Sequence, residues 1–332
     1  MIGVAVVGLG VGEQHLKAYL DNENCSVVSI YDIDKEKAKA VAGRYGSFSV
    51  AGNFEDIIKD KTVDIISIAS YDDAHFEQII SAIKENKHLF IEKPLCRTYD
   101  ELTYIKRSLK DKKGLKLASN LVLRSTPLYK YLKEIITKGD MGKIYSFDGD
   151  YLYGRLHKIT HGWRRDVENY SVMEGGGVHL VDLMLYLTEE KPSSVIGFGN
   201  RICTENTSFR YNDYMASTFL FTSGMIGRIT ANFGCVHQHQ HVVRIFGTKK
   251  TFIYDDKGPR MYDKYDPGDE GEKINLSPLP SSKGDLVPGF VTSIVKDEDI
   301  TSQIQHEFDL ISACIASDDS CKENKMKEIK YI

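Results

Sequence analysis

Short, wholly apolar runs recur along the first third of the chain, and they alternate with segments whose apolar residues recur three or four positions apart. An apolar run without helical period is typical of a strand buried on both faces of a sheet. Strands and helices that alternate about every 20 to 25 residues predict a parallel, doubly wound α/β sheet with right-handed crossovers. The predicted strands are 2–7, 26–31, 64–69, 87–91 and 115–118, and the predicted helices include 13–20, 73–85 and 100–112.

The pattern changes after residue 120. A helix is expected over 126–138, and β-rich runs follow it, of which 215–221 and 226–233 are joined through Thr222-Ser223-Gly224, a hairpin signal. Strands met consecutively through hairpins favour an antiparallel sheet. The remaining expected elements are strands at 144–151, 194–201, 242–246 and 251–254, a long loop from Pro267 to Pro288, and a helix over 305–316.

A glycine loop, Gly8-Leu9-Gly10-Val11-Gly12, directly follows the first strand and precedes the first helix. A strand, a glycine turn and a helix form the phosphate-binding unit of a doubly wound sheet. Glycine permits the turn and a close approach to a pyrophosphate, and the helix start offers N–H groups to the anion. The standard fingerprint places its third glycine at position 13, where this chain has Glu13, one place after Gly12.

The second predicted strand ends at Asp32, 20 residues after Gly12. A carboxylate at this point accepts hydrogen bonds from the adenosine ribose hydroxyls and repels a 2′-phosphate, so we predict NAD in preference to NADP. Asp34 is a weaker candidate for this role, and we expect it to be the N-cap of a helix that starts at Lys35.

Polar residues follow the ends of the predicted parallel strands, where ligands of such sheets bind. They are expected to line one crevice. The predicted cofactor-binding residues are Gly8, Gly10, Gly12, Asp32, Ser70, His75, Glu92, Lys93 and Asn120.

Lys93 lies in Ile91-Glu92-Lys93-Pro94, just after a buried strand, and the proline constrains its backbone. Removal of a hydride from a carbon requires removal of the proton from its hydroxyl, so a positioned acid–base group is needed there. We predict that the Lys93 ammonium bonds the substrate oxygen, and that Glu92 either orients Lys93 or contacts the nicotinamide ribose. The alternative is a solvated surface lysine.

A second motif runs from Glu174 through Gly175-Gly176-Gly177 to His179 and Asp182. His179 and Asp182 are three positions apart and share a helix face. Imidazole transfers protons near neutral pH, so His179 is a candidate acid–base group. The alternative is a core histidine whose hydrogen bonds are satisfied.

Together, Gly8-Leu9-Gly10, Asp32, Glu92-Lys93-Pro94 and the Gly-Gly-Gly-x-His-x-x-Asp stretch resemble the glucose–fructose oxidoreductase, inositol dehydrogenase and MocA (Gfo/Idh/MocA) family over nearly the whole chain. The resemblance implies an NAD-binding Rossmann domain, 1–120. It also implies a substrate-binding and oligomerisation domain, 121–332, with an open, mostly antiparallel sheet that often builds a homodimer or homotetramer interface.

The chain departs from the family at Gly175, because family members usually carry an aspartate four residues before the histidine, in a lysine–aspartate–histidine set. Either Glu174 or Asp182 takes the orienting role, or no carboxylate does. We predict that His179 is the principal acid–base group, that Lys93 polarises the substrate oxygen, and that Asp182 orients either the substrate or His179.

A cation-rich segment, 155–166, holds the only tryptophan, Trp163, followed by Arg164 and Arg165. A mobile loop of this kind covers a substrate and pairs with a phosphate or carboxylate, and family members resemble it in placing a Trp-Arg pair near the active site. Tyr153 and Asp182 complete the predicted substrate-binding set. A nucleotide sugar or sugar acid is therefore one hypothesis for the substrate, and a solvated charged loop is the alternative.

His237, His239 and His241 alternate and would share one face of a strand, as metal ligands do. Adjacent histidines in one extended segment rarely surround an ion without ligands from elsewhere, and hydride transfer needs no metal. We therefore expect no metal, and a polar strand face near the substrate or at a subunit contact.

The bulk composition agrees with a two-domain enzyme of 332 residues. The net charge of −4 argues against nucleic-acid binding, and no apolar run is long enough for a membrane span. Six cysteines without a Cys-x-x-Cys pair are expected to be reduced thiols in a cytoplasmic protein.

The expected function is NAD-dependent oxidation or reduction at a secondary hydroxyl or ketone of a sugar, polyol or nucleotide sugar. One alternative is a glycosidase of the same fold that uses NAD transiently and shows no net NADH. The other is a regulatory protein that binds dinucleotide without catalysis, although Lys93 and His179 argue against it.

Overall fold

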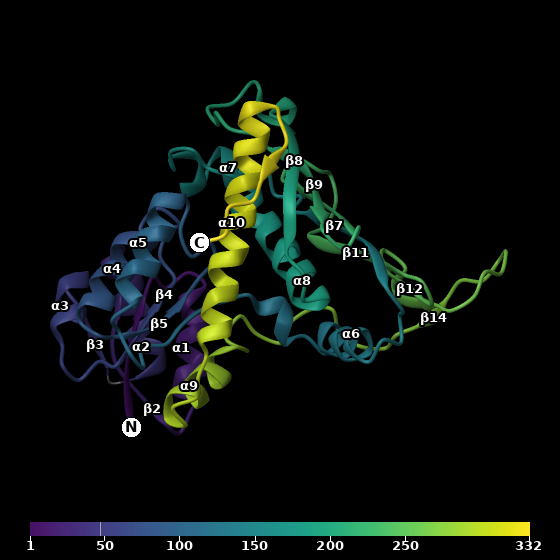
Figure 1. Ribbon diagram of the computed structural model, residues 1–332. Helices are drawn as coiled ribbons and strands as arrows, with labels where there is room; N and C mark the ends of the chain where they lie inside the picture. Colours follow the sequence, from purple (N-terminus) through teal and green to yellow (C-terminus); the bar gives the residue numbers. More distant parts are fainter. Residues whose placement is uncertain (47) are drawn as a thin grey trace. The chain divides into compact units, whose positions relative to one another are not determined.

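The computed structural model describes residues 1–46 and 48–332. The chain forms two compact units (Figure 1). Unit 1 comprises Met1–Val122, Pro280–Phe308 and Ile332, and unit 2 comprises Leu123–Leu279 and Asp309–Tyr331. The functional division into an NAD-binding domain, 1–120, and a substrate-binding domain, 121–332, stays a prediction.

Unit 1 is built on a parallel sheet, which among the described residues has six strands in the order β3-β2-β1-β4-β5-β6. The predicted doubly wound sheet is confirmed. The strands are β1 (Ile2–Val7), β2 (Cys25–Tyr31), β3 (Ser49–Val50), β4 (Ile65–Ile68), β5 (His88–Ile91) and β6 (Leu117–Ser119). The helices are α1 (Gly12–Leu20), α2 (Lys35–Tyr45), α3 (Phe54–Lys59), α4 (His75–Lys84), α5 (Tyr99–Leu109) and α9 (Val287–Val295).

Local chemistry sets where these helices begin. Asp34 is the N-cap of α2, as predicted, and its Oδ1 accepts the backbone N–H groups of Glu36 and Lys37 at 3.1 Å. Thr98 and Glu101 form a reciprocal capping box at the start of α5. Side chains therefore satisfy backbone donors that each first helical turn leaves without partners.

The core of unit 1 includes a segment from far along the chain. Phe290 and Val291 of α9 pack with Val4, Val6 and Phe90 of the sheet, and all of them are buried. The expected long loop up to Pro288 is therefore wrong at its end, because α9 begins at residue 287. The loop also contains the short strand β14 (Glu272–Lys273).

Unit 2 is built on a sheet with nine strands among the described residues, in the order β14-β13-β12-β11-β7-β10-β9-β8-β15. All neighbours are antiparallel except β10 and β7, which run parallel, so the predicted mostly antiparallel sheet is confirmed. The other strands are β7 (Ile144–Leu152), β8 (Pro192–Asn200), β9 (Tyr214–Phe221), β10 (Ile226–Asn232), β11 (Gln240–Gly247), β12 (Thr251–Asp255), β13 (Gly258–Tyr262) and β15 (Lys327–Glu328).

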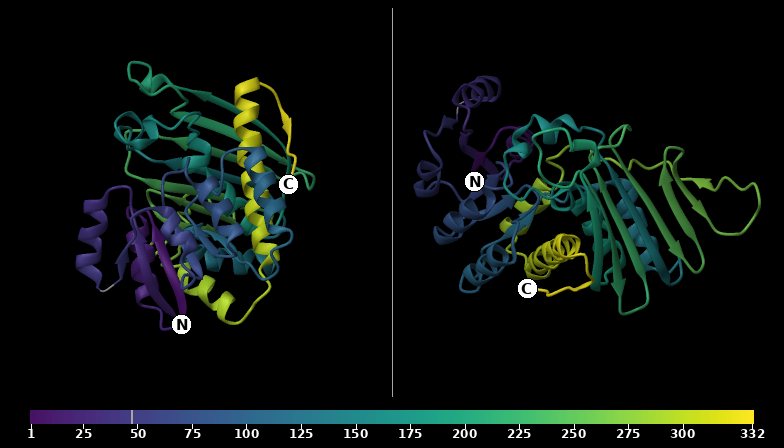
Figure 2. Two further views of the ribbon diagram at one scale, coloured as in Figure 1. Left: turned by 90° about the vertical axis from the view of Figure 1, so that its left-hand side faces the viewer. Right: turned by 90° about the horizontal axis from the view of Figure 1, so that it is seen from above.

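One face of this sheet is covered by α8 (Val178–Thr188), which packs on β7 and β10 (Figure 2). Glycines permit this contact, because a Cβ at Gly149 would lie 3.2 Å from the side chain of Leu180 and one at Gly227 would lie 2.2 Å from Met184 Sδ. The further helices are α6 (Pro127–Thr137), α7 (His157–Thr160) and α10 (Thr301–Glu323), which is longer than the predicted 305–316.

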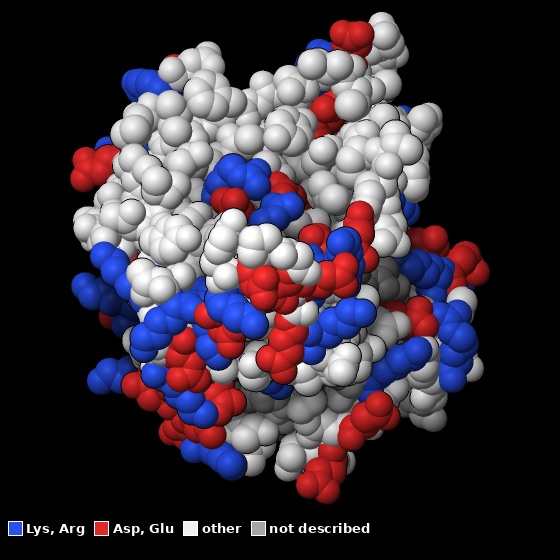
Figure 3. All heavy atoms as spheres, turned by 90° about the vertical axis from the view of Figure 1, so that its right-hand side faces the viewer, with Lys and Arg blue, Asp and Glu red and all other residues white. Residues whose placement is uncertain are grey.

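The side of the molecule that Figure 3 shows has a broad uncharged area around a compact group of acidic and basic side chains. In the sheet of unit 2, Asp150 lies between Arg228 and Arg244, at 2.9 and 3.1 Å from a guanidinium nitrogen of each. Arg228 also lies 3.5 Å from Asp148, so two carboxylates balance two guanidinium groups on these strands, and Thr230 donates to Asp150 at 2.9 Å.

In the part of the chain that the structure describes, no helix has the length and apolar character needed to cross a membrane. All six cysteines are free thiols.

Candidate active site

The glycine loop of unit 1 has the geometry of a phosphate-binding turn. Gly8 follows β1 with a φ of +82°, and a Cβ there would lie 2.4 Å from the Ala69 carbonyl oxygen, so only glycine fits. A Cβ on Gly10 would meet nothing within 4 Å, which leaves open space above the backbone. Gly12 starts α1 and is buried, with its ideal Cβ 3.1 Å from that of Ala69. The loop therefore fits a pyrophosphate at the start of α1.

Asp32 follows β2 and is held by the same loop. Its Oδ2 accepts the N–H of Leu9 at 2.7 Å and a hydrogen bond from Lys37 Nζ at 2.9 Å, and its Oδ1 accepts the N–H of Asp34 at 3.0 Å. Burial opposes ionisation, but these donors outweigh it and hold the pKa of Asp32 below its ordinary value. Asp32 is therefore an ionised acceptor beside the glycine loop, with a half-exposed cation, Lys37, as its neighbour.

A buried polar network lies beneath the Glu-Lys-Pro segment. His15 of α1 is fully buried, and its ring nitrogens lie 3.0 Å from Ser67 Oγ and 3.1 Å from Glu92 Oε1. Asn120 Nδ2 donates to Glu92 Oε1 at 2.7 Å and to the Lys283 carbonyl at 2.8 Å. Burial raises the pKa of Glu92, but the hydrogen bonds from His15 and Asn120 and the nearby Lys93 charge lower it to about 2.

His15 is a residue that sequence reasoning missed. It lies on the buried face of α1 beside Leu16 and Tyr19, where a single histidine gives no periodic signal. In the structure His15 is the central member of the network that positions Glu92. The network thereby also positions the segment that carries Lys93.

His75 fixes the same segment from another side. Its ring is fully buried, with Nδ1 2.7 Å from the Pro94 carbonyl oxygen and Nε2 3.3 Å from the Ser70 carbonyl oxygen. Ser70 Oγ donates to Gln78 Oε1 at 2.7 Å. The structure thus gives His75 a positioning contact to the Glu-Lys-Pro turn, whose Lys93-Pro94 peptide bond is cis. Direct contact of Ser70 and His75 with a cofactor stays a prediction.

The carboxyl ends of the parallel strands bring the predicted cofactor residues to one edge of the sheet. Gly8, Asp32 and Asn120 directly follow β1, β2 and β6, and Ser70 and Lys93 stand two positions past β4 and β5. These strands are neighbours in the sheet, so the residues belong to one edge.

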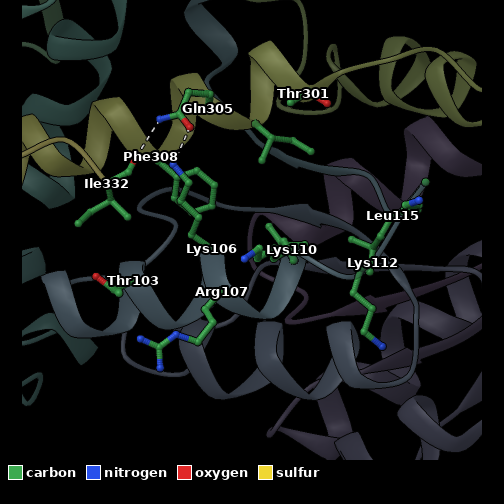
Figure 4. Close-up of a pocket in the computed structure, with 14 residues that line it drawn as sticks. Thr103, Lys106, Arg107, Lys110, Lys112, Leu115, Thr301, Gln305, Phe308 and Ile332 are labelled. Carbon is green, nitrogen blue, oxygen red and sulfur yellow. Dashed lines mark hydrogen bonds between the residues drawn. The ribbon is translucent and has the colours of Figure 1, made fainter.

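A separate hollow of about 740 Å³ lies in unit 1 between α5 and the start of α10, beside the segment that precedes β6. Figure 4 shows Lys106 directed at Gln305, to which it donates at 2.9 Å, while Arg107 and Lys112 point away from it. The hollow lies where β6 begins rather than where the strands end, and its cations do not converge, so we do not assign it to the active site.

In unit 2, the second motif places His179 and Asp182 on α8. The two side chains are 8% and 1% exposed. Arg124, in the 3₁₀ turn η1 (Val122–Ser125), forms an ion pair with Asp182. Its Nε donates to the two carboxylate oxygens at 3.1 and 3.0 Å, and its Nη2 donates to Oδ1. Both oxygens of the Asp182 carboxylate therefore accept hydrogen bonds from the Arg124 guanidinium. That Asp182 orients the substrate or His179 stays a prediction.

The glycines before His179 form a π-helical turn, η3 (Met173–Gly177), a local geometry often found at functional sites. An ideal Cβ at Gly175 would lie 2.1 Å from Tyr170 Oη, and one at Gly176 would lie 2.4 Å from the Tyr151 ring. Tyr170 therefore occupies the space that a side chain at position 175 would need. Glu174 is also buried, at 5% exposure.

Two of the three alternating histidines join His179 around Tyr151 of β7. The Tyr151 ring centroid lies 5.2 Å from those of His239 and His241 and 6.3 Å from that of His179. His237 instead pairs with Asp256 at 3.3 Å. No group of residues suited to hold a metal ion is found among the described side chains. Only His241 lies in a strand, β11, so the expected common strand face is wrong for His237 and His239. Nothing in the sequence signalled that His239 and His241 lie near His179.

The cation-rich segment contains the short helix α7 and the 3₁₀ turn η2 (Trp163–Arg165), and its expected mobility stays a prediction. The Arg164 guanidinium stacks 4.4 Å from the Trp163 ring centroid, and exposed Arg165 pairs with Asp166 at 2.8 Å. Burial raises the pKa of Tyr151, and the positive charges of Arg164 and Arg155 oppose that rise.

The Tyr153 ring also belongs to this surface, because it stacks with Tyr151 at 5.8 Å and the Arg155 guanidinium lies 5.4 Å from its centroid. Unit 2 thus presents imidazoles, phenols and guanidinium groups together. These groups can hydrogen-bond a polyhydroxylated or anionic molecule and exchange a proton with it.

Comparison with known proteins agrees with both units. The model of an oxidoreductase family with an NAD-binding Rossmann fold matches residues 2–120, and the GFO/IDH/MocA C-terminal domain model matches residues 129–253. The 2,7-anhydro-N-acetylneuraminate hydratase of Escherichia coli (strain K12) is 25% identical over 267 residues, which cover 77% of this chain and 68% of that protein.

Two solved structures share the fold. Levoglucosan dehydrogenase, in complex with NADH and levoglucosan, superposes with a TM-score of 0.85 at 21% identity and 100% coverage of both chains. Scyllo-inositol dehydrogenase from Lactobacillus casei, with bound NAD(H) and scyllo-inositol, gives 0.80 at 16% identity and 99% coverage of both. The chain belongs to the Gfo/Idh/MocA oxidoreductase family, with a dinucleotide-binding Rossmann fold at its N-terminus.

Proposed function

We propose that this protein is an NAD-dependent oxidoreductase that acts on a secondary hydroxyl or ketone of a sugar, polyol or nucleotide sugar. The observation that carries the proposal is the imidazole of His179, which is buried among aromatic rings in a chain whose other unit holds a dinucleotide loop. An acid–base group set in a ring-lined surface fits the oxidation of a hydroxyl-bearing ring compound.

NAD, when bound at the glycine loop, would supply a nicotinamide that accepts or returns the hydride. Lys93 donates a hydrogen bond to the substrate oxygen, and His179 takes up or returns the hydroxyl proton. Glu92, fixed by His15 and Asn120, sets the position of the segment that carries Lys93. Asp182, whose carboxylate is held by Arg124, orients either the substrate or His179, which lies on the same helix.

Asp32 favours NAD over NADP in this proposal. Its ionised carboxylate, next to the glycine loop, accepts the hydrogen bonds of the ribose hydroxyls. Lys37 weakens this preference, because its side chain is 39% exposed and its ammonium lies beside Asp32, where it can attract a phosphate. We therefore expect a preference for NAD without strict exclusion of NADP.

The substrate contacts are assigned to Tyr153, Trp163 and Arg164, with Arg165 at the outer edge. The Arg164 guanidinium carbon lies over the Trp163 ring, 4.4 Å from its centroid, and a guanidinium group recognises carboxylates and phosphates through paired N–H donors. The charge of Arg165 is balanced by Asp166, so Arg165 contributes less to recognition of an anionic group on the substrate. An anionic sugar or nucleotide sugar is therefore preferred over a neutral polyol.

The similarity to 2,7-anhydro-N-acetylneuraminate hydratase favours one alternative, a reaction without net change in the cofactor. In that case the enzyme oxidises its substrate transiently, eliminates or adds across a bond, and reduces the product again. The same groups, Lys93 and His179, would serve it, and a glycosidase of this fold is the corresponding hydrolytic variant.

The division into an NAD-binding part, 1–120, and a substrate-binding part, 121–332, belongs to the proposal, as does a homodimer or homotetramer. A cytoplasmic location is also part of the proposal.

The test is a panel assay of purified protein with NAD and NADP separately. Neutral polyols, sugars, sugar acids and nucleotide sugars are added in turn, and reduced nicotinamide is followed by absorbance, with product analysis by mass spectrometry. A rise with NAD and one substrate class is the expected result. Conversion of a substrate without any rise would favour the transient-oxidation alternative, and no conversion at all would contradict both.

A further inference from the structure

Three imidazoles in unit 2 lead from the interior to the surface. His179 on α8 and His241 on β11 are both buried at 8% exposure, and their ring centroids are 5.8 Å apart at an interplanar angle of 87°. His239, just before β11, is exposed, and its centroid lies 5.1 Å from that of His241. The proposed function uses His179 alone and leaves this series unexplained.

We propose that His241 and His239 carry the proton of His179 to and from the solvent. This inference rests on the proposed function, because that function gives His179 one proton in each turnover. An imidazole binds a proton at one ring nitrogen while it releases another from the second, so imidazoles in series can relay a proton. Centroid separations of 5 to 6 Å place ring nitrogens within reach of a direct hydrogen bond or of one bridging water.

In oxidation the substrate C–H bond would break and its hydride would pass to a bound nicotinamide. The substrate O–H bond breaks as well, its electron pair forms the second bond of the C=O group, and the proton passes to His179. His179 releases its other N–H proton to His241, which releases one to His239, which releases one to water. Each imidazole ends in its starting charge after the rings exchange tautomers, and reduction runs the same series backwards.

The groups that face the series do not compete for this proton at neutral pH. Tyr151 of β7 touches all three rings, and burial raises its phenol pKa, so it stays protonated. Tyr153, after β7, lies 5.4 Å from His239 by ring centroids.

The charged groups that act on Tyr151 are Arg155 and Arg164, both cations. Neither cation takes a proton from the series, because a guanidinium is always protonated and has no acceptor.

Simple packing is a poor account of these histidines. A buried polar ring costs free energy unless it has partners, and leucine or phenylalanine would fill the same sheet face. The outermost ring, His239, is exposed, whereas His179 and His241 are equally buried, so the series ends at the solvent.

The kinetic test replaces each outer member in the full-length protein, as His241→Gln and His239→Gln. The matched control is His237→Gln, two positions along, whose ring pairs with Asp256. With the panel compound that reduces NAD fastest, we expect kcat of His241→Gln to fall at least about 10-fold with KM within about 2-fold, as for loss of proton transfer alone. Added imidazole at constant ionic strength should restore a large part of kcat, and the control should be unaffected.

A second test needs neither cofactor nor substrate. The protein is labelled with isotopic histidine, and the ring signals are titrated by NMR. Coupled imidazoles change one another's titration, so His239→Gln should shift the midpoint of His241 by at least about 0.5 pH unit, whereas His237→Gln should not. Midpoints that do not respond would overturn the proposal.

A fall in kcat that imidazole does not rescue would also overturn it, because it would indicate a structural role. Melting temperatures of the variants identify misfolded protein, and for a misfolded His241→Gln the exposed His239→Gln decides the kinetic question. If no panel compound is converted, the proposed function fails on its own, while the NMR titration still decides whether the rings are coupled.

Discussion

The ion pair between Arg124 and Asp182 gives the sharpest prediction about the substrate-side unit. Asp182 is 1% exposed, Arg124 is 18% exposed by side chain, and Nε contacts both carboxylate oxygens. Two unit charges about 4 Å apart attract by about 4 kcal/mol at an effective dielectric constant of about 20. Removal of one partner of a buried pair costs about 3–5 kcal/mol, because the other charge is left uncompensated.

We therefore expect Arg124→Met to lower the free energy of unfolding of unit 2 by about 3–5 kcal/mol. Trp163 is the only tryptophan and lies in unit 2, so urea unfolding followed by its fluorescence reports on this unit. The double variant Arg124→Met with Asp182→Asn should recover much of the loss, because no buried charge remains. Lys138→Met is the control, since its pair with Glu134 is exposed on both sides and should give no measurable change. A loss below about 1 kcal/mol for Arg124→Met would refute the assignment of a buried, charged pair.

Three further predictions follow from the sites described above. The pKa of Glu92, lowered to about 2, contributes stability that is present above its unfolded pKa and is lost as pH falls towards 2. Glu92→Gln should therefore lower the free energy of unfolding by up to about 3 kcal/mol at pH 7, and by progressively less below about pH 4.5. Urea unfolding followed by circular dichroism measures this difference. An unchanging difference between wild type and variant across that range would contradict the shift. Asp32→Ala should weaken NADH binding and shift the NADPH:NADH affinity ratio at least about 10-fold towards NADPH, because Lys37 is left without its carboxylate partner. Calorimetric titration measures both affinities. An unchanged ratio would show that Asp32 does not bind the ribose hydroxyls. Gly175→Asp should lower the melting temperature, because the new side chain would clash with Tyr170 Oη, and an added Tyr170→Phe should restore part of the loss. A Gly175→Asp variant as stable as wild type would disprove this clash.

The sequence was sufficient for the elements whose signal is local. Strands such as β1 are buried on both faces, so Val4 and Val6 lie in an unbroken apolar run that is readable without any knowledge of partners. Asp34 at the N-cap of α2 and the glycine at position 8 likewise follow from chemistry within a few residues.

The missed features depend on partners that are distant in the chain. Phe290 and Val291 of α9 follow a Gly- and Pro-rich stretch, and only the core of unit 1, formed by residues near the N-terminus, shows why a helix is stable there. The parallel pairing of β10 with β7 is another long-range contact without a local signal.

The candidate site shows the same division. His15 could not be distinguished from an ordinary core histidine until Ser67 and Glu92 stood beside it. The alternation of the histidines was visible in the sequence, but the proximity of His241 to His179 depends on the pairing of β11 with β7 and on the packing of α8.

The central claim, that His179 is the acid–base group of an NAD-dependent oxidoreductase, is tested most directly by His179→Ala. With the substrate found in the panel, kcat and the dissociation constant for NADH are measured on wild type, His179→Ala and the control His237→Ala. The account predicts a fall in kcat of about 10²–10⁴-fold for His179→Ala, with NADH affinity unchanged and the control active. An unchanged kcat, or an equal loss of kcat and NADH affinity, would contradict it.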